Sequence, residues 1–278
     1  MNSLLVSASW LAQHIDDVDL IVLDASSSSN ISGKKPEFED CFIQGARYFD
    51  LNNKFSDSNA PFPNTRPSQE QFQQEARNLG INNESSIVVY DNLGLYNSPR
   101  VWWMLKAMGH KHVAVLDGGL SAWVHAGFPT SATHATNYAH GNFTASFNSD
   151  ALVAMDEVKA NIASKQFTLI DARSKGRFNG TAPEPREGLS SGHVPGSCNV
   201  PFQEVLNNGF MKSEEELRAI FDKLMLADKP LVFSCGSGLT ACITLLAAEF
   251  VLPNQMAIYD GSWTEWASTE DAVIEKMV

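Results

Sequence analysis

The chain has 278 residues, of which 44% are hydrophobic and 19% charged, and its formal net charge is −12. This composition is typical of a globular protein, and the length favours two domains. Nucleic acids and anionic membranes are bound by clustered Lys and Arg, so the charge argues against both as partners. A few local arginines can still bind a small anionic substrate.

The ends and the cysteines favour a cytoplasmic protein. The first residues, MNSLLVSASWLAQHIDD, have no basic start and only a short apolar run, so we expect no secretory signal. No window approaches the roughly 20 apolar residues of a membrane span. The cysteines form no C-x-x-C pair, which argues against a zinc site or a dithiol. We therefore expect free thiols in a reducing cytoplasm; the cysteines are Cys41, Cys198, Cys235 and Cys242.

In chain order, the first half alternates short β-branched runs with a helical pattern. The expected strands are LIVLD at 20–24, SIVVYD at 86–91 and VAVLD at 113–117. The apolar spacing of VWWMLKAMGH at 101–110 predicts a helix. The segment TSATHATNYAHGNFTAS at 130–146 is polar and has no apolar period, so we interpret it as a linker.

The second half shows the same alternation. Its expected strands are FTLID at 167–171, PLVFSC at 230–235 and MAIYD at 256–260. The pattern EEELRAIFDKLML at 214–226 predicts a helix, and an S-x-x-E capping box formed by Ser213 and Glu216 marks its start. Strands that alternate with helices predict an α/β fold, with a mostly parallel sheet flanked by helices. Chemistry in such folds gathers at the carboxyl ends of the strands.

The two halves also resemble each other segment by segment. Four segments recur in the same order at a nearly constant displacement, which indicates a duplicated domain rather than a solenoid. We expect a first domain at 1–135, a linker at 136–149 and a second domain at 150–278. The matching pairs are LIVLDASSS and FTLIDARSK, FIQGARYFDL and HVPGSCNVPF, SIVVYDN and PLVFSCG, and VLDGGLSAW and IYDGSWTEW.

The loop after the strand PLVFSC places a cysteine where a nucleophile would lie. The residues that follow Cys235, GSG, allow a tight loop whose N–H groups point at one centre. Those donors and a helix starting near Leu239 or Thr240 favour a thiolate, the nucleophilic form. The alternative is a small core residue. That interpretation suits Cys242, which lies in the apolar helix, and we extend it to the two remaining cysteines.

Together these features resemble the tandem-domain rhodanese-type sulfurtransferases. The resemblance covers essentially the whole chain and is carried by SPRVWWMLKAMGH, VLDGGLSAW, SGHVPG with NVPF, CGSGLTA and YDGSWTEW. It implies two rhodanese-like domains, and a cysteine in the second that takes up a sulfane sulfur as a persulfide. The sulfur then passes to cyanide or to a thiol such as thioredoxin or a small thiol. Asp91 stands opposite Cys235 in the repeat, so we expect the first domain to be non-catalytic.

The loop also bears on the sulfur donor. Within the family, a loop resembling C-R-K-G-V-T goes with thiosulfate and one resembling C-G-S-G-V-T with 3-mercaptopyruvate. This chain has CGSGLT, in which Leu239 is the departure. Thiosulfate is a compact dianion that suits a cationic loop, whereas Gly236 and Ser237 supply only N–H groups and a hydroxyl. The resemblance thus predicts 3-mercaptopyruvate as the donor, with thiosulfate as the alternative.

Substrate contacts are implied by the same resemblance. It aligns substrate-binding arginines with Arg177 and Arg186 in the loop GRFNGTAPEPREG at 176–188. Arginine suits a planar carboxylate, although both residues can equally be surface groups paired with Glu184 or Glu187. No metal or organic cofactor is expected. The loop groups expected to hold substrate and persulfide are Gly236, Gly238, Leu239 and Thr240.

One departure concerns proton transfer. Members that use 3-mercaptopyruvate usually carry an acidic residue and a His in the segment corresponding to 49–67, proposed to form a relay with the loop serine. Here the acidic position corresponds to Asn52 or Asn53 and the His position to Asn64. We therefore expect no Ser–His–Asp relay, and the catalytic role of Ser237 is that of a hydrogen-bond donor. His193 in SGHVPG is interpreted as holding a turn.

Two other classes compete with this hypothesis. A cysteine phosphatase needs Arg six residues after its cysteine, and that position holds Ala241. A non-enzymatic sulfur carrier or binding protein of the same fold is the second alternative. The intact cysteine, loop and arginine pair argue against an inactive protein. The sequence gives neither the acceptor nor the pathway, and a monomer is the default expectation.

Overall fold

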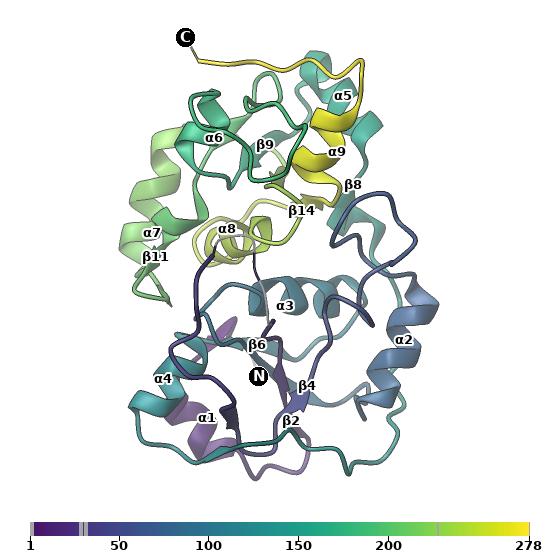
Figure 1. Ribbon diagram of the computed structural model, residues 1–278, viewed down its shortest axis with the longest axis vertical. Helices are drawn as coiled ribbons and strands as arrows, with labels where there is room; N and C mark the ends of the chain where they lie inside the picture. Colours follow the sequence, from purple (N-terminus) through teal and green to yellow (C-terminus); the bar gives the residue numbers. More distant parts are fainter. Residues whose placement is uncertain (1–2, 28–29, 31–32, 227, 278) are drawn as a thin grey trace. The chain divides into compact units, whose positions relative to one another are not determined.

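The computed structural model describes residues 3–27, 30, 33–226 and 228–277 (Figure 1). The chain divides into two compact units. The first comprises Met1–Ser58, Arg66–Asn148 and Asn208–Met211, and the second comprises Asn59–Thr65, Ser149–Asn207 and Lys212–Val278. Of the linker expected at 136–149, residues 136–148 therefore group with the first unit.

The first unit is built on a five-stranded sheet in which all neighbouring strands are parallel. Its strand order is β1 (Leu5–Val6), β6 (Val113–Leu116), β5 (Ser86–Tyr90), β2 (Leu20–Asp24) and β4 (Arg47–Tyr48). The helices are α1 (Ala8–His14), α2 (Gln69–Asn78), α3 (Ser98–Ala107) and α4 (Gly119–His125). A separate antiparallel pair joins β3 (Phe42–Ile43) to β7 (Thr130–Ser131).

The core of the first unit lies against both faces of this sheet. Leu11 of α1 and Trp123 of α4 belong to one cluster with alternate strand residues such as Val22 and Val88. Helix α3 packs on β5 and β6. Strands β5 and β6 are therefore buried along almost their whole length, which is why they occur in the sequence as continuous apolar runs.

The second unit repeats this topology. Its parallel sheet runs β10 (Cys198–Asn199), β9 (Thr168–Asp171), β13 (Leu231–Ser234), β14 (Met256–Tyr259) and β8 (Leu152–Val153), the order of the first sheet read from its other edge. The helices are α5 (Met155–Ser164), α6 (Lys175–Asn179), α7 (Glu214–Phe221), α8 (Ala241–Glu249) and α9 (Ser262–Ser268). The remaining short elements are η1 (Ser149–Ala151), η2 (Phe202–Val205), η3 (Asp222–Leu224), β11 (Leu206–Asn207) and β12 (Phe210–Met211).

Helices also cover both faces of the second sheet (Figure 1). Val158 of α5 and Trp263 and Trp266 of α9 share one cluster with Val232 and Tyr259 of the sheet. Helix α8 packs on β13 and β14, and it is buried on all sides except near its end. This burial explains its uniformly apolar sequence. The α/β fold class predicted from the sequence is thus confirmed in both units.

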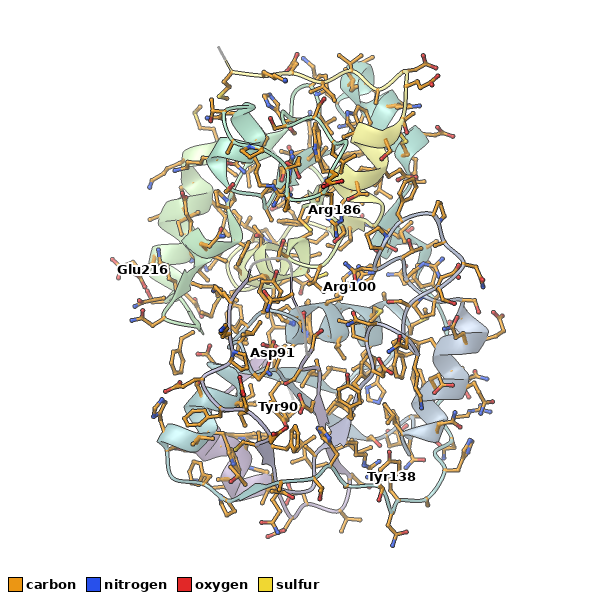
Figure 2. All side chains as sticks on the ribbon, viewed as in Figure 1. Tyr90, Asp91, Arg100, Tyr138, Arg186 and Glu216 are labelled. Carbon is orange, nitrogen blue, oxygen red and sulfur yellow. The ribbon has the colours of Figure 1, made fainter. Side chains whose placement is uncertain are left out.

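The capping box predicted for the helix after Ser213 is present. Ser213 Oγ accepts a hydrogen bond from Glu216 N, and Glu216 Oε2 accepts one from Ser213 N (Figure 2 labels Glu216). Ser213 Oγ also donates to Glu216 Oε2 at 2.9 Å, and this bond together with the one from Ser213 N lowers the pKa of Glu216. The predicted helix over 214–226 is shorter in the structure: α7 ends at Phe221 and continues as η3 only to Leu224. Met225 then adopts a left-handed conformation with φ 46°, which a helix cannot continue through.

No helix in the described part of the chain combines the length and the apolar character needed to cross a membrane.

Candidate active site

Cys235 follows the last residue of β13, at the carboxyl edge of the second sheet. β13 lies between β9 and β14, so the cysteine leaves the sheet at its centre. Its exposed fraction is 1%. Thr240 is the N-cap of α8, and the helix begins at Ala241, close to the start expected from the sequence. The loop Gly236–Thr240 therefore joins a buried strand to a buried helix, the place where parallel sheets gather ligands.

The segment after β14 holds the backbone of Cys235 and Gly236. Ser262 Oγ accepts a hydrogen bond from Cys235 N at 3.2 Å, and Trp263 N donates to Cys235 O at 3.0 Å. Thr264 donates to Gly236 O through both its N–H and its hydroxyl. Ser262 has φ 52°, and its hydroxyl also donates to Tyr259 O at 2.8 Å. These bonds hold the backbone of Cys235 and Gly236 from one side.

The rest of the loop offers N–H groups to a ligand. Within the described residues, no acceptor is bonded to the N–H groups of Gly236, Ser237, Leu239 and Thr240. Backbone N–H groups in a compact loop at the start of a helix form a site for an anion. The arrangement suits a negatively charged sulfur species.

Both arginines implicated by the sequence lie beside this loop. A Cβ added at Gly236 would lie 3.1 Å from Arg177 Nη2 and 3.4 Å from Arg186 Nη1. Arg177 belongs to α6, and Arg186 (labelled in Figure 2) comes from the segment that follows this helix. The structure thus brings two guanidinium groups to the residue after Cys235.

Glu184 anchors Arg177. Its two carboxylate oxygens accept from Arg177 Nη2 at 2.6 Å and from Arg177 Nε at 3.1 Å, and one of them also accepts from Arg173 Nη1 at 2.8 Å. The sequence alternative that Arg177 pairs with Glu184 is therefore correct. The pairing orients Arg177 while leaving its side chain 21% exposed.

Arg173 is a buried support residue that the sequence analysis missed. Its guanidinium pairs with Asp171 at 2.6 Å, donates to Gly192 O and stacks over the Trp263 ring at 4.0 Å. Burial disfavours its charged form, but Asp171 and Glu184 outweigh burial and raise the pKa of Arg173. The available signal was the motif DAR directly after β9. Ser262 was also missed, although it lies in the quoted motif YDGSWTEW.

Ser237 receives two hydrogen bonds. Asn64 Nδ2 donates to Ser237 Oγ at 2.8 Å, and Arg186 Nη2 donates to the same oxygen at 3.3 Å. Asn64 belongs to Asn59–Thr65, the short segment that groups with the second unit. It has φ 61°, a left-handed conformation that asparagine tolerates.

The other polar candidates lie in different surroundings. Asn52 donates to Ser27 Oγ, and Asn53 donates to the Asp50 carboxylate. His193 Nδ1 lies 2.9 Å from Phe178 O and its ring stacks on Phe178, as suits a residue that holds a turn. Among the described residues, no group of three or more His, Cys, Asp or Glu side chains is placed to hold a metal ion. We assign no residues to a cofactor.

The remaining cysteines are free thiols outside the loop centre. Cys242 is fully buried in α8 and its Sγ donates to Gly238 O at 3.4 Å. Cys198 is half-buried in β10, and burial raises the pKa of its thiol. Cys41 is half-exposed in the first unit.

The corresponding loop of the first unit is closed by its own carboxylate. Asp91 (labelled in Figure 2) follows β5 as Cys235 follows β13. Its oxygens accept from the backbone N–H groups of Leu93, Tyr96, Asn97 and Ser98 and from the Ser98 hydroxyl, at 2.7–2.9 Å. The loop N–H groups thus bind an internal anion.

Comparison with known proteins decides the family. The model of the rhodanese-like domain matches the chain twice, at residues 7–126 and 154–269. The chain belongs to the rhodanese-type sulfurtransferases. It is similar to the 3-mercaptopyruvate sulfurtransferase of Homo sapiens, at 40% identity over 98% of this chain and 95% of the relative. It is also similar to the thiosulfate sulfurtransferase of Rattus norvegicus, at 42% identity over 94% and 91% of the two chains.

A solved rhodanese structure has the same fold. SseA from Escherichia coli, described as a 3-mercaptopyruvate sulfotransferase, superposes with a TM-score of 0.82 at 36% identity, over 94% of this chain and 99% of its own. Relatives that are named for different donors match this rhodanese at nearly equal identity. The choice of donor therefore rests on the residues of the site.

Proposed function

We propose that this rhodanese transfers a sulfane sulfur from 3-mercaptopyruvate through a persulfide on Cys235 to a thiol or cyanide, and releases pyruvate. The observation that carries the proposal is that Arg177 and Arg186 lie beside Gly236. Gly236 belongs to the loop that begins at Cys235, and this loop has no charged residues of its own.

The charges around the loop favour a donor with one carboxylate. Asp171 and Glu184 balance Arg173 and Arg177 within one ion-pair network. Arg186 brings a further guanidinium next to Ser237. A planar carboxylate can accept paired hydrogen bonds from guanidinium groups. The compact dianion thiosulfate would gain more from cationic side chains in the loop itself, where this chain has Gly236 and Ser237.

The chemistry balances with the groups that are present. The Cys235 thiolate attacks the sulfur of the donor, the carbon–sulfur bond breaks, and its electron pair passes to the enolate of pyruvate. The hydrogen that the donor thiol brings, now on the outer sulfur, moves to the enolate carbon. The products are pyruvate and a persulfide anion, which the loop N–H groups from Gly236 to Thr240 stabilise. No step uses a metal, an organic cofactor, an oxidant or a reductant.

An acceptor completes the cycle. A thiolate of thioredoxin or of a small thiol, or cyanide, attacks the outer sulfur and restores the Cys235 thiolate. The first domain takes no part in this exchange, because Asp91 stands in place of a nucleophile and its carboxylate binds the loop N–H groups. The free thiols suit a reducing cytoplasm, and fractionation of cells would test that location.

Initial rates with the two donors test the proposal. With cyanide as acceptor, we expect kcat/KM for 3-mercaptopyruvate to exceed that for thiosulfate by at least about a hundredfold, since recognition of one carboxylate through buried polar groups discriminates strongly. Equal or thiosulfate-favoured efficiency would favour a thiosulfate sulfurtransferase. Absence of turnover with either donor, together with uptake of sulfur, would favour a sulfur carrier.

A further inference from the structure

The hydroxyl of Ser237 has only one hydrogen and two positions at which it accepts. Asn64 Nδ2 and Arg186 Nη2 both donate to its oxygen, at 2.8 and 3.3 Å. A guanidinium has no acceptor, so the hydrogen of Ser237 cannot point to Arg186. The side chain is buried, with 7% of the residue exposed. The hydrogen is consequently left for a third direction, toward whatever occupies the loop.

We propose that Asn64 is a positioning residue that turns the Ser237 hydroxyl into a fixed hydrogen-bond donor for the carbonyl oxygen of 3-mercaptopyruvate, and that it transfers no proton. This inference rests on the proposed function. Neither an amide nor a guanidinium changes its protonation state near neutral pH, so the partners of Ser237 cannot relay a proton.

A fixed donor is sufficient for this reaction. When the carbon–sulfur bond breaks, negative charge develops on the carbonyl oxygen of the leaving enolate, and a donor already aimed at that oxygen favours the transition state over the ground state. The proton that the enolate carbon needs comes from the donor thiol itself. The leaving group of thiosulfate is sulfite, which has no such carbonyl, so the contribution of Asn64 depends on the donor.

The backbone at Asn64 dictates which substitutions are informative. Because φ is 61°, alanine would add backbone strain, whereas glycine and aspartate tolerate this conformation. Asn64→Gly removes the donor to Ser237. Asn64→Asp has nearly the same shape, but its carboxylate accepts the Ser237 hydrogen and turns it away from the substrate. Asn208, exposed and with φ 50°, provides matched controls in Asn208→Gly and Asn208→Asp.

The test is single-turnover formation of the Cys235 persulfide with each donor. We expect both Asn64 variants to slow the reaction with 3-mercaptopyruvate by roughly tenfold to a hundredfold, as when an oxyanion donor is lost. With thiosulfate, the rate for Asn64→Gly should change less than about twofold, and the Asn208 controls should match the wild type. In a Ser237→Ala background, Asn64→Gly should have little further effect, because residues that act as one unit are not additive.

Each outcome bears on the inference. Asn64 variants that react with 3-mercaptopyruvate at the wild-type rate overturn it while leaving the proposed function intact. Equal losses with both donors in Asn64→Gly would assign Asn64 a merely structural role and also overturn it. A wild-type protein that releases no pyruvate overturns the proposed function, and the inference with it.

Discussion

Cys235 differs from Cys242 in what surrounds it, since both side chains are buried. Cys242 lies in α8 and donates to Gly238 O, whereas Cys235 precedes a loop in which four N–H groups have no acceptor among the described residues. Cys235→Ser should abolish sulfur transfer. Cys242→Ser should retain more than about half of kcat, because its hydroxyl can donate to the same carbonyl. Turnover assays of both variants check this, and an inactive, folded Cys242→Ser protein would contradict the assignment.

Gly236 keeps the space between the loop and the two arginines. Its backbone is outside the left-handed region, so alanine fits the chain, but the new Cβ would lie tightly against Arg177 Nη2 and Arg186 Nη1. Gly236→Ala should raise KM for 3-mercaptopyruvate by about fivefold to thirtyfold, from a displacement that costs roughly 1–2 kcal/mol. Thermal unfolding serves as the control for folding. Unchanged KM would mean that the arginines do not bind the donor.

Cys198 tests whether the remaining thiols are inert. Burial raises the pKa of this thiol, so the reactive thiolate is scarce at neutral pH and increases as pH rises toward that pKa. Alkylation of Cys198 by iodoacetamide, followed by peptide mass spectrometry, should therefore be slow near pH 7 and accelerate steadily above pH 9. Rapid labelling at neutral pH would contradict this environment.

At the scale of elements, the two strand–loop–helix connections show two uses of one geometry. In the β13–α8 loop, the N–H groups of Gly236, Ser237, Leu239 and Thr240 have no acceptor among the described residues. In the β5–α3 loop, the corresponding donors bind the Asp91 carboxylate. The first connection can therefore accept an anionic ligand, and the second already contains one.

Asp91→Asn probes this internal anion. The amide would turn an N–H₂ group toward backbone donors that now bind a carboxylate oxygen, and the side chain is fully buried. We expect a loss of about 2–4 kcal/mol in the free energy of unfolding, the range for removing hydrogen bonds to a buried charged group. Denaturant unfolding measures it. A variant as stable as the wild type would show that the carboxylate does not hold the loop.

The elements were predictable where one physical pattern dominates. The strands β2, β5, β6, β9, β13 and β14 lie within the β-branched runs because their sheets are covered on both faces. Residues 136–148 were not predictable as part of the first unit. They are held by bonds such as Asn142 N to Asn82 Oδ1 and by the single buried ring of Phe143, neither of which leaves a periodic pattern.

The sequence predicted some residues of the candidate site and missed others. Cys235 follows from its loop, and Arg177 and Arg186 from the family resemblance. The support residues Arg173 and Ser262 were missed because their contacts with Trp263 and Cys235 join residues that lie far apart in the sequence. Such contacts depend on how the sheet is assembled, which one sequence does not state.

At the scale of the whole molecule, the question is how a protein with net charge −12 binds an anionic donor. The two domains share one topology, and in the described part of the second domain Arg177 and Arg186 lie beside Gly236 at the carboxyl edge of the sheet. Salt screens the charges of distant surface groups within about 10 Å at 0.1 M. The arginines next to the loop act at contact distance and so determine local binding.

The central claim is that sulfur from 3-mercaptopyruvate is transferred to Cys235. Peptide mass spectrometry of the protein treated briefly with this donor, without acceptor, tests it directly. We predict a gain of one sulfur atom on Cys235, release of one pyruvate for each persulfide, and no gain on Cys41, Cys198 or Cys242. Added sulfur on another cysteine, or pyruvate release from Cys235→Ser, would contradict it.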